Sequence, residues 1–333
     1  MKHFLNLAAF LLLTYVNLSA QPTAAAQSLF EKLSPIENAP VTLTTDFTAL
    51  KQDKKMIDYQ DGLLSGSDGK TYHIGVRPRG KFRRRIAEIP PLKLKIKKKL
   101  LAEAGLVDSL NEIKLVLPTT MDDKGNDLVI REYLVYRMYE LVSPYAVRAR
   151  LVNLTMINTN PDSKNPRTFL AKAILLEHEE ETAARLGGKM IEDHFGMTMD
   201  SLHREQAALT AVFQYMIGNT DWNIAEHRNL RFLRLPTGDL VPIPFDFDFC
   251  GFVNAPYATP KSETGLRNVQ ERYLMADALP AEVVKSAARK IQQQQEAFRR
   301  LCRSGLLPEK SRRSAESYLD SYFKEANLSE AGE

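Results

Sequence analysis

Apolar side chains recur at helical spacing in the segment that precedes Gly218. The recurring positions are Leu209, Val212, Phe213, Met216 and Ile217. Intervals of three and four residues place side chains on one face of a helix, so the pattern predicts an amphipathic helix. Glycine readily adopts the left-handed conformation that ends many helices, so we expect this helix to end at Gly218. A polar loop that contains Asp221 follows, and the packed helix should hold it in place.

Two short apolar runs come after this loop, at residues 230–235 and 240–245. The intervening Pro, Thr, Gly and Asp at 236–239 favour a turn, so the pattern predicts a β-hairpin. Asp246 and Asp248 stand two residues apart at the end of the hairpin. In extended chain such side chains point to the same face, about 6–7 Å apart. The return strand should therefore carry both carboxylates toward the loop of Asp221.

The first half of the chain has the alternating pattern of half-buried strands. Residues 40–47, 72–76 and 92–96 alternate between apolar and polar side chains, whereas 58–69 is rich in turn formers. We predict an antiparallel N-terminal sheet from these runs. Residues 127–141 carry an apolar stripe and predict a helix. The remaining predicted elements are strands at 146–157 and 168–177 and helices at 281–301 and 315–326.

The order of helix, Asp-bearing loop, hairpin and second Asp-bearing turn is typical of protein kinases. Two departures are visible. Glu226 stands five residues after Asp221, where a typical kinase has Asn, and Asp248 stands where a kinase has Gly. Each carboxylate taken alone is equally typical of an ordinary turn or helix cap. The ordered combination favours a catalytic site.

Several short segments together resemble the CotH family of atypical kinases, known from spore-coat proteins and from secreted proteins. An Asn-x-Asp loop follows a helix, and a Pro-aromatic-Asp-x-Asp sequence ends a strand. The matching pieces, in chain order, are Arg79-Gly80 with Arg83, the lysine-bearing run 91–96, Arg131-Glu132, Leu175-Leu176-Glu177, Asn219-Thr220-Asp221 and Pro244-Phe245-Asp246-Phe247-Asp248. Each piece is short, so the specificity lies in their order over residues 76–251.

The resemblance implies an α+β, bilobal protein-kinase-like fold. A β-rich antiparallel sheet lobe would span residues 27–178 and contain one key helix. A mainly helical lobe that carries the catalytic hairpin would span 179–333. The implied reaction is metal-dependent transfer of phosphate from ATP to a hydroxyl group of a protein or other polymer acceptor.

The resemblance also implies a role for each candidate residue. Asp221 would accept the proton of the acceptor hydroxyl, and Lys93, held by Glu132, would contact the α and β phosphates. Further nucleotide contacts would come from Arg79, Arg83, Lys95 and, at the adenine, the backbone around Glu177. The predicted ligands of Mg²⁺ or Mn²⁺ are Asp246 and Asp248, with Asn223 and Asn229 as possible additions. Plainer readings remain open, namely a solvated basic loop at 77–85 and lysines that face water on the strand at 92–96.

Charge is unevenly distributed along the chain. The net charge of the 333 residues is +4, yet residues 76–99 contain eleven Lys or Arg and one acidic residue, Glu88. Such a stretch attracts polyanions. No helix-turn-helix, zinc-finger or RNP sequence accompanies it, which disfavours nucleic acid as the partner. Two alternatives to a kinase stay open: a catalytically inactive envelope protein that binds an acidic polymer or protein, and a phosphate-ester hydrolase.

The N-terminus has the pattern of a secretory signal peptide. Lys2 precedes an apolar run at 4–13, and small residues follow, with cleavage expected after Ala20 or Ala26. The run is shorter than the roughly 20 residues that span a bilayer, so we expect no transmembrane span in the mature chain. The predicted location is outside the cell or in the periplasm or cell envelope. Cys250 and Cys302 could form one bridge there, although a small buried thiol is the reading we favour for Cys250.

Overall fold

The computed structural model describes residues 26–162, 168–192, 196–276 and 278–331. Apart from Ala26, the predicted signal peptide lies outside these ranges. The strands are β1 (Ala39–Thr45), β2 (Gln60–Ser65), β3 (Thr71–Pro78), β4 (Leu92–Ile96), β5 (Glu112–Val116), β6 (Ala149–Asn158), β7 (Thr168–Leu176), β8 (Lys189–Ile191), β9 (Leu230–Arg234) and β10 (Leu240–Pro244). The helices are α1 (Leu29–Leu33), α2 (Phe47–Gln52), α3 (Arg83–Ile86), α4 (Lys98–Glu103), α5 (Asp123–Val142), α6 (Glu179–Arg185), α7 (Arg204–Ile217), α8 (Ala281–Gln292), α9 (Gln295–Cys302) and α10 (Glu309–Ala331), with short 3₁₀ turns at Met199–Ser201 and Ser262–Thr264.

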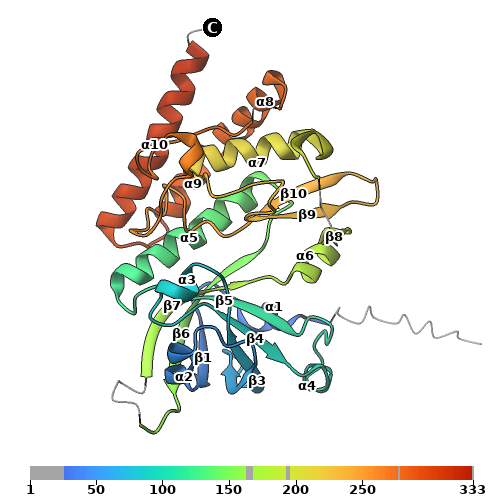
Figure 1. Cartoon of the computed structure of the whole chain (residues 1–333), viewed down its shortest axis with the longest axis vertical. Helices are drawn as coiled ribbons and strands as arrows, with labels where there is room; N and C mark the ends of the chain where they lie inside the picture. Colours follow the sequence, from blue (N-terminus) through green and yellow to red (C-terminus); the bar gives the residue numbers. More distant parts are fainter. Residues whose placement is uncertain (1–25, 163–167, 193–195, 277, 332–333) are drawn as a thin grey trace, which may run out of the picture.

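Strands β1 to β7 form a closed barrel in the order β1-β2-β3-β4-β5-β7-β6 (Figure 1). The barrel closes because β1 pairs in parallel with β6, with Ala39 opposite Val152, while the other neighbouring strands pair antiparallel. A closed mixed barrel is not an antiparallel sheet lobe. The prediction of a bilobal protein-kinase-like fold with such a lobe is therefore wrong.

The barrel interior explains why the alternating segments became strands. Every second side chain of β1 and β4 is buried, and these side chains pack with those of β3 in one apolar core. Strand β2 lies within residues 58–69, which we had expected to be turns, and β5 was not predicted. Most strands could thus be predicted from the burial of one face. Which strands pair with one another depends on contacts between residues that are far apart in sequence.

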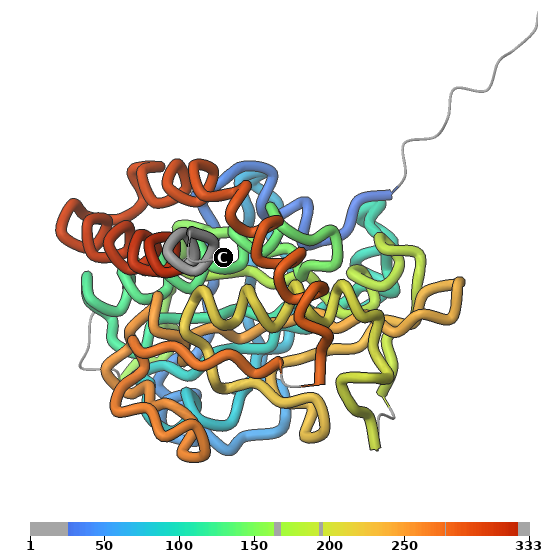
Figure 2. Tube along the Cα trace, turned by 90° about the horizontal axis from the view of Figure 1, so that it is seen from above, coloured from blue at the N-terminus to red at the C-terminus, as the bar shows by residue number. Residues whose placement is uncertain are grey.

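Helix α5 lies between the barrel and the helices α7, α8, α9 and α10 (Figure 1). It contributes buried residues to a second core, which it shares with α7, α9 and α10. In the perpendicular view, α7 crosses near the middle of the molecule and α10 is seen nearly along its axis (Figure 2). Helix α5 begins at Asp123, earlier than predicted, because the Asp122 side chain caps it by accepting a hydrogen bond from Gly125 N–H at 2.8 Å.

The predicted helix and hairpin around the Asp221 loop are confirmed. Helix α7 ends at Ile217, and Gly218 adopts the left-handed conformation with φ of 66°. Strands β9 and β10 pair antiparallel and join β8 in a small three-stranded sheet. Asn219 N–H donates to the Gln214 carbonyl at 2.8 Å, which closes the helix end. The loop that carries Asp221 therefore starts from a fixed point.

We expect Gly218→Ala to destabilise the protein more than Gly238→Ala does. Both glycines have positive φ, 66° and 93°, so alanine strains the backbone at either site by about 1 kcal/mol. A Cβ at position 218 would lie 2.1 Å from the Tyr318 hydroxyl oxygen, whereas at position 238 no described atom lies within 4 Å. Overpacking should add about 1–3 kcal/mol at position 218 alone. Urea unfolding of both variants measures the difference, and equal losses would contradict this account.

No helix within the described ranges is both long enough and apolar enough to cross a bilayer.

Candidate functional site

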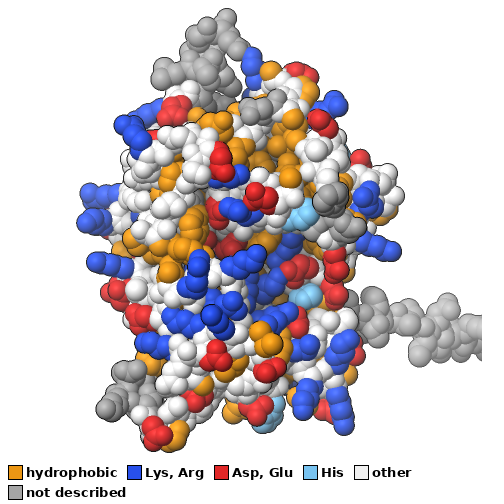
Figure 3. All heavy atoms as spheres, viewed as in Figure 1, with side chains coloured by type: hydrophobic (Ala, Val, Ile, Leu, Met, Phe, Trp, Pro, Cys, Tyr) orange, Lys and Arg blue, Asp and Glu red, His pale blue; other side chains and the backbone are white. Residues whose placement is uncertain are grey.

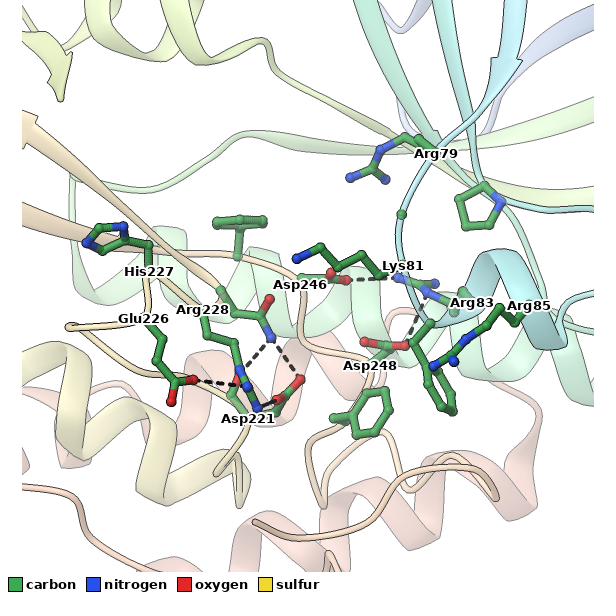
Figure 4. Close-up of a pocket in the computed structure, with 16 residues that line it drawn as sticks. Arg79, Lys81, Arg83, Arg85, Asp221, Glu226, His227, Arg228, Asp246 and Asp248 are labelled. Carbon is green, nitrogen blue, oxygen red and sulfur yellow. Dashed lines mark hydrogen bonds and ion pairs between the residues drawn. The ribbon is translucent and has the colours of Figure 1, made fainter. Parts of the chain in front are cut away.

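A cavity of about 650 Å³ lies between the barrel and the helical part. It is lined by side chains from three segments that are far apart in sequence (Figure 4). The segment between β3 and β4 contributes Arg79, Lys81, Arg83 and Arg85; the loop after α7 contributes Asp221, Glu226, Arg228 and Asn229; the turn after β10 contributes Asp246, Asp248 and Phe249. The three aspartates singled out in the sequence thus line one pocket, opposite a group of cations.

The Asp221 carboxylate is held by its own loop. Asn229 Nδ2 donates to Asp221 Oδ2 at 3.0 Å and to the Asp221 carbonyl at 2.6 Å. Arg228 Nη1 lies 3.4 Å from Asp221 Oδ1. Burial raises the pKa of Asp221, Arg228 opposes this rise, and the charge of Asp246 adds to it. The result is an oriented carboxylate with increased basicity that still faces the pocket.

Asp246 occupies a left-handed backbone conformation, with φ of 63°. Its backbone N–H donates to the Tyr136 hydroxyl of α5 at 2.9 Å, and this hydrogen bond stabilises the conformation. A non-glycine residue with positive φ is uncommon, and such residues cluster at functional sites. The turn directs the Asp246 side chain into the pocket, where 39% of it is exposed. The Asp248 side chain is only 7% exposed. Tyr136 was not identified from the sequence.

The Arg83 guanidinium joins three carboxylates, and Figure 4 shows its contacts with two of them, Asp246 and Asp248. Arg83 Nη1 and Nη2 donate to the two carboxylate oxygens of Glu132 at 3.0 and 3.1 Å. Nη2 also donates to Asp246 at 3.1 Å, and Nε lies 3.1 Å from Asp248 Oδ2. Arg83 and Glu132 are buried, at 8% and 2% side-chain exposure. The fully ionised cluster would carry two more negative than positive charges.

The pKa values in this cluster reflect that excess of negative charge. Burial raises the pKa of Asp248 to about 8 against the opposing effect of Arg83, and the neighbouring Asp246 and Glu132 add to the rise. Burial also raises the pKa of Glu132, again against the attraction of Arg83. The site therefore favours binding of a proton or of another cation.

The predicted Lys93–Glu132 ion pair does not form. Glu132 pairs with Arg83, and the Lys93 ammonium pairs with Glu112 on the neighbouring strand β5. Lys95 lies 3.3 Å from the same Glu112 and is 48% exposed. Neither lysine lines the pocket. Arg83, which we had assigned to the phosphates, is thus the cation that orders Glu132.

Two further predicted residues serve the local structure. The Glu177 carboxylate is completely buried and accepts hydrogen bonds from Arg185 and Thr182. Its backbone N–H donates to the Arg148 carbonyl at 2.9 Å, so this donor is not available to an adenine ring. Asn223 Oδ1 accepts from Glu226 N–H at 2.9 Å, and Asn223 does not line the pocket. Asn229 does line it, as a partner of Asp221.

A second, partly buried ion cluster lies next to the pocket and was not predicted from the sequence. Glu179 at the start of α6 pairs with Lys114 of β5 and with Arg231 of β9, the latter at 2.9 Å. Burial and the nearby Arg231 lower the pKa of Lys114 to about 8. The Arg231 guanidinium lies over the ring of Phe245, 4.5 Å from its centroid, and Phe245 lines the pocket.

Both cysteines are free and buried, and they belong to the core shared by α5, α7 and α10. Burial raises the pKa of each thiol to about 12, so neither is an ionised nucleophile near neutral pH.

In comparisons with known proteins, the chain matches no family model and no curated protein.

Proposed function

We propose that this pocket transfers a phosphoryl group from a nucleoside triphosphate, ATP in the first instance, to a hydroxyl group of a protein or polymer acceptor. One observation carries the proposal. Three of the six segments behind the CotH resemblance, at Arg79–Arg83, Asp221 and Asp246–Asp248, line a single cavity although up to 169 residues separate them. Phosphoryl transfer is mainly positioning and charge stabilisation, and this cavity offers carboxylates on one side and cations on the other.

The cations on the barrel side suit a polyphosphate. Arg79 and Lys81 line the cavity, and within the described ranges neither forms an ion pair with an acidic side chain. Arg79 reaches into the cavity from the barrel side, above Asp246 (Figure 4). Its backbone N–H donates to the Pro91 carbonyl at 2.8 Å, which anchors the residue. A guanidinium in this position can bind phosphate oxygens through two parallel hydrogen bonds.

The carboxylates on the opposite side suit a hard divalent cation. Across the described residues, no group of three or more His, Cys, Asp or Glu is arranged to hold a metal ion alone. Mg²⁺ commonly takes one or two carboxylates and completes its shell with phosphate oxygens and water. Asp246 and Asp248 fit that requirement, and Mg²⁺ or Mn²⁺ would neutralise phosphate charge there. The negative excess around Arg83 favours such a cation.

The remaining steps fall to residues of the chain. Asp221 would accept a hydrogen bond from the acceptor hydroxyl and take its proton as the hydroxyl oxygen bonds to the γ-phosphorus. The bond from that phosphorus to the oxygen shared with the β phosphate would break, and the nucleoside diphosphate would leave with both electrons of that bond. Asn229 would keep the Asp221 carboxylate in place through its amide, which already donates to Asp221 Oδ2. Arg79 and Lys81 would hold the phosphate oxygens that stay with the nucleotide.

Thermal unfolding with and without nucleotide tests this proposal. A ligand present at 100 times its dissociation constant stabilises a protein by about 2.7 kcal/mol, which raises the melting temperature by several degrees. We expect such a rise with Mg²⁺ and ATP, and its loss in Asp246→Asn, each protein being compared with its own ligand-free state. Transfer of radiolabelled phosphate to a hydroxyl polymer then tests the reaction. No rise with either Mg²⁺ or Mn²⁺ and any of the common nucleoside triphosphates would refute the proposal.

We expect Arg79→Met to weaken ATP binding and Lys93→Met to leave it nearly unchanged. Arg79 lines the cavity without an acidic partner in the described structure, whereas Lys93 is paired with Glu112 outside the cavity. A charged hydrogen bond contributes about 1.5–3 kcal/mol, so the first variant should lose about tenfold or more in affinity. Titration calorimetry measures both constants. A larger loss of ATP affinity in Lys93→Met than in Arg79→Met would contradict this prediction and indicate that Lys93 contacts the nucleotide.

A further inference from the structure

A second cavity adjoins the candidate site and is lined entirely by cationic side chains. Its volume is about 520 Å³, and its lining residues are Lys54, Lys55, Lys81, Arg84 and Arg85. We call it the basic groove. Lys81 and Arg85 also line the larger cavity that contains Asp221, so the two spaces lie next to each other. In the space-filling view, Lys and Arg side chains gather across the middle of one face, where the barrel meets the helical part (Figure 3).

The groove is built on an anchored segment. Arg83 is buried in the carboxylate cluster, which fixes α3, while Arg85 of the same helical turn is exposed. Lys54 Nζ donates to the Ala87 carbonyl at 2.7 Å and to the Arg85 carbonyl at 3.3 Å, which ties the turn after α2 to this segment. The groove is therefore a fixed feature of the surface.

The charge of the groove is not neutralised internally. In the part of the chain that the structure describes, none of its five cations forms an ion pair with an acidic side chain. Five like charges gathered within one groove repel one another and destabilise the folded state. Such an arrangement is typical of a surface that binds an anionic partner.

We propose that the basic groove binds an acidic segment of the acceptor and thereby brings a neighbouring hydroxyl group to Asp221. The part that concerns the hydroxyl rests on the proposed phosphoryl transfer, whereas the binding of the acidic segment does not. Because the groove adjoins the cavity that contains Asp221, the Asp or Glu side chains would lie a few residues away from the Ser, Thr or Tyr that receives phosphate. The substrate class is then an acidic protein.

The aromatic residues next to the groove favour a peptide over a nucleic acid. Single-stranded nucleic acids bind largely by stacking bases on open aromatic faces. Here Phe82 packs edge-on against Phe249, with ring centroids 5.1 Å apart, and both rings contact Tyr257 at 5.7 Å. The Arg85 guanidinium lies over Phe82 at 5.7 Å. These rings are engaged with one another and with Arg85, while the lysines and arginines remain available to carboxylates.

Fluorescence anisotropy with two labelled peptides tests the inference. Both contain one serine; one is flanked by Asp and Glu, and the other by Asn and Gln at the same positions. We expect the acidic peptide to bind the unmodified protein, without nucleotide, about tenfold more tightly or better, and to lose about tenfold in Lys55→Glu/Arg84→Glu. The matched control is Lys98→Glu/Lys324→Glu, which changes the net charge equally at two exposed sites away from the groove. It should stay within about twofold of the unmodified protein.

Three outcomes would overturn the inference. The first is equal affinity for the acidic and neutral peptides. The second is an equal loss in the two double variants, which would reduce the effect to overall charge. The third is displacement of the peptide by an oligonucleotide of the same net charge at lower concentrations than by unlabelled peptide, which would identify a nucleic-acid site. Absence of phosphoryl transfer with retained binding of the acidic peptide would count against the proposed function alone, because the binding is measured without nucleotide.

Discussion

Asp221→Asn is expected to lower the rate of phosphoryl transfer by about 10²- to 10⁴-fold, the usual contribution of a positioned general base. The substitution keeps the shape of the side chain and the contact with the Asn229 amide at one oxygen, but it removes the proton acceptor. Nucleotide contacts from Arg79 and Lys81 lie on the opposite side of the cavity and should persist. Single-turnover kinetics with labelled ATP measures the rate, and the thermal shift with Mg²⁺ and ATP measures binding.

Glu226→Gln provides the matched control for this prediction. Glu226 lines the same cavity and pairs with the same Arg228, at 3.0 Å, yet its side chain is 52% exposed. Removing its charge should change the transfer rate by no more than about twofold, because a solvated surface pair contributes little. Equal losses in the two variants would mean that the loop needs its net charge, and that Asp221 has no special role.

The pH dependence of transfer gives a second readout for Asp221. Burial raises its pKa, and a general base acts only when deprotonated. Transfer by the unmodified protein should therefore increase as pH rises through this raised pKa. The residual transfer of Asp221→Asn should lack that step. A profile with the same step in both proteins would assign it to another group.

The local elements around the site could be predicted because they depend on nearby residues. The apolar stripe of α7, the left-handed glycine at 218 and the turn at 236–239 each act over a few positions. The pairing of β1 with β6 could not be predicted in this way. It joins Ala39 to Val152 in parallel, and an alternating pattern indicates a buried face without indicating the neighbouring strand. The prediction of the fold class was wrong because it did not include this pairing.

In the candidate site, too, contacts between residues close in sequence could be predicted and contacts between distant residues could not. Asp221, Asp246 and Asp248 were predicted to converge, and they do line one cavity, because the hairpin joins them over a short stretch of chain. The Lys93–Glu132 pair failed because strand β5 was not predicted. Lys95 stands opposite Glu112 of β5 in the register, and Glu112 takes up both Lys95 and Lys93. The two lysines therefore pair with Glu112 on the adjacent strand and not with Glu132 on helix α5.

The central position of Arg83 has no local sequence signal. It is one of three consecutive arginines, and only its contacts with α5 and with the turn after β10 distinguish it from Arg84 and Arg85. These contacts span 49 and 165 residues. Consecutive arginines usually indicate a solvated surface, and that expectation holds for Arg85 but not for the residue that joins the three carboxylates.

Arg83→Met should destabilise the protein by about 3–5 kcal/mol at about pH 9, the usual cost of removing one partner from a buried ion pair. Methionine fills similar space but leaves Glu132 and Asp248 without their cation. Both carboxyl groups already have raised pKa values because of burial, and the loss of Arg83 would raise them further. Urea unfolding of the variant and of the unmodified protein measures the difference.

The direction of the pH effect follows from linkage. A carboxyl group with a folded-state pKa above its unfolded value binds more protons in the folded protein, so stability falls as pH rises between the two values. For Asp248 the interval runs from the unfolded value of 3.8 to about 8 in the unmodified protein, and it extends to higher pH in Arg83→Met because loss of the cation raises the folded-state pKa further. The two proteins therefore lose stability in parallel up to about pH 8, and the deficit of Arg83→Met should be smaller at about pH 5 than at about pH 9.

A compensated variant separates charge from packing. Adding Glu132→Gln and Asp248→Asn to Arg83→Met removes both buried charges. This triple variant should recover most of the lost stability at about pH 9 and show a weaker pH dependence than Arg83→Met. Neutral amides of nearly the same shape can still pack beside methionine. Two results would contradict this account: a triple variant as unstable as Arg83→Met, or a loss in Arg83→Met that does not vary with pH. Either would mean that Arg83 stabilises the protein through packing. The carboxylate cluster would then lack the excess negative charge on which the cation site depends.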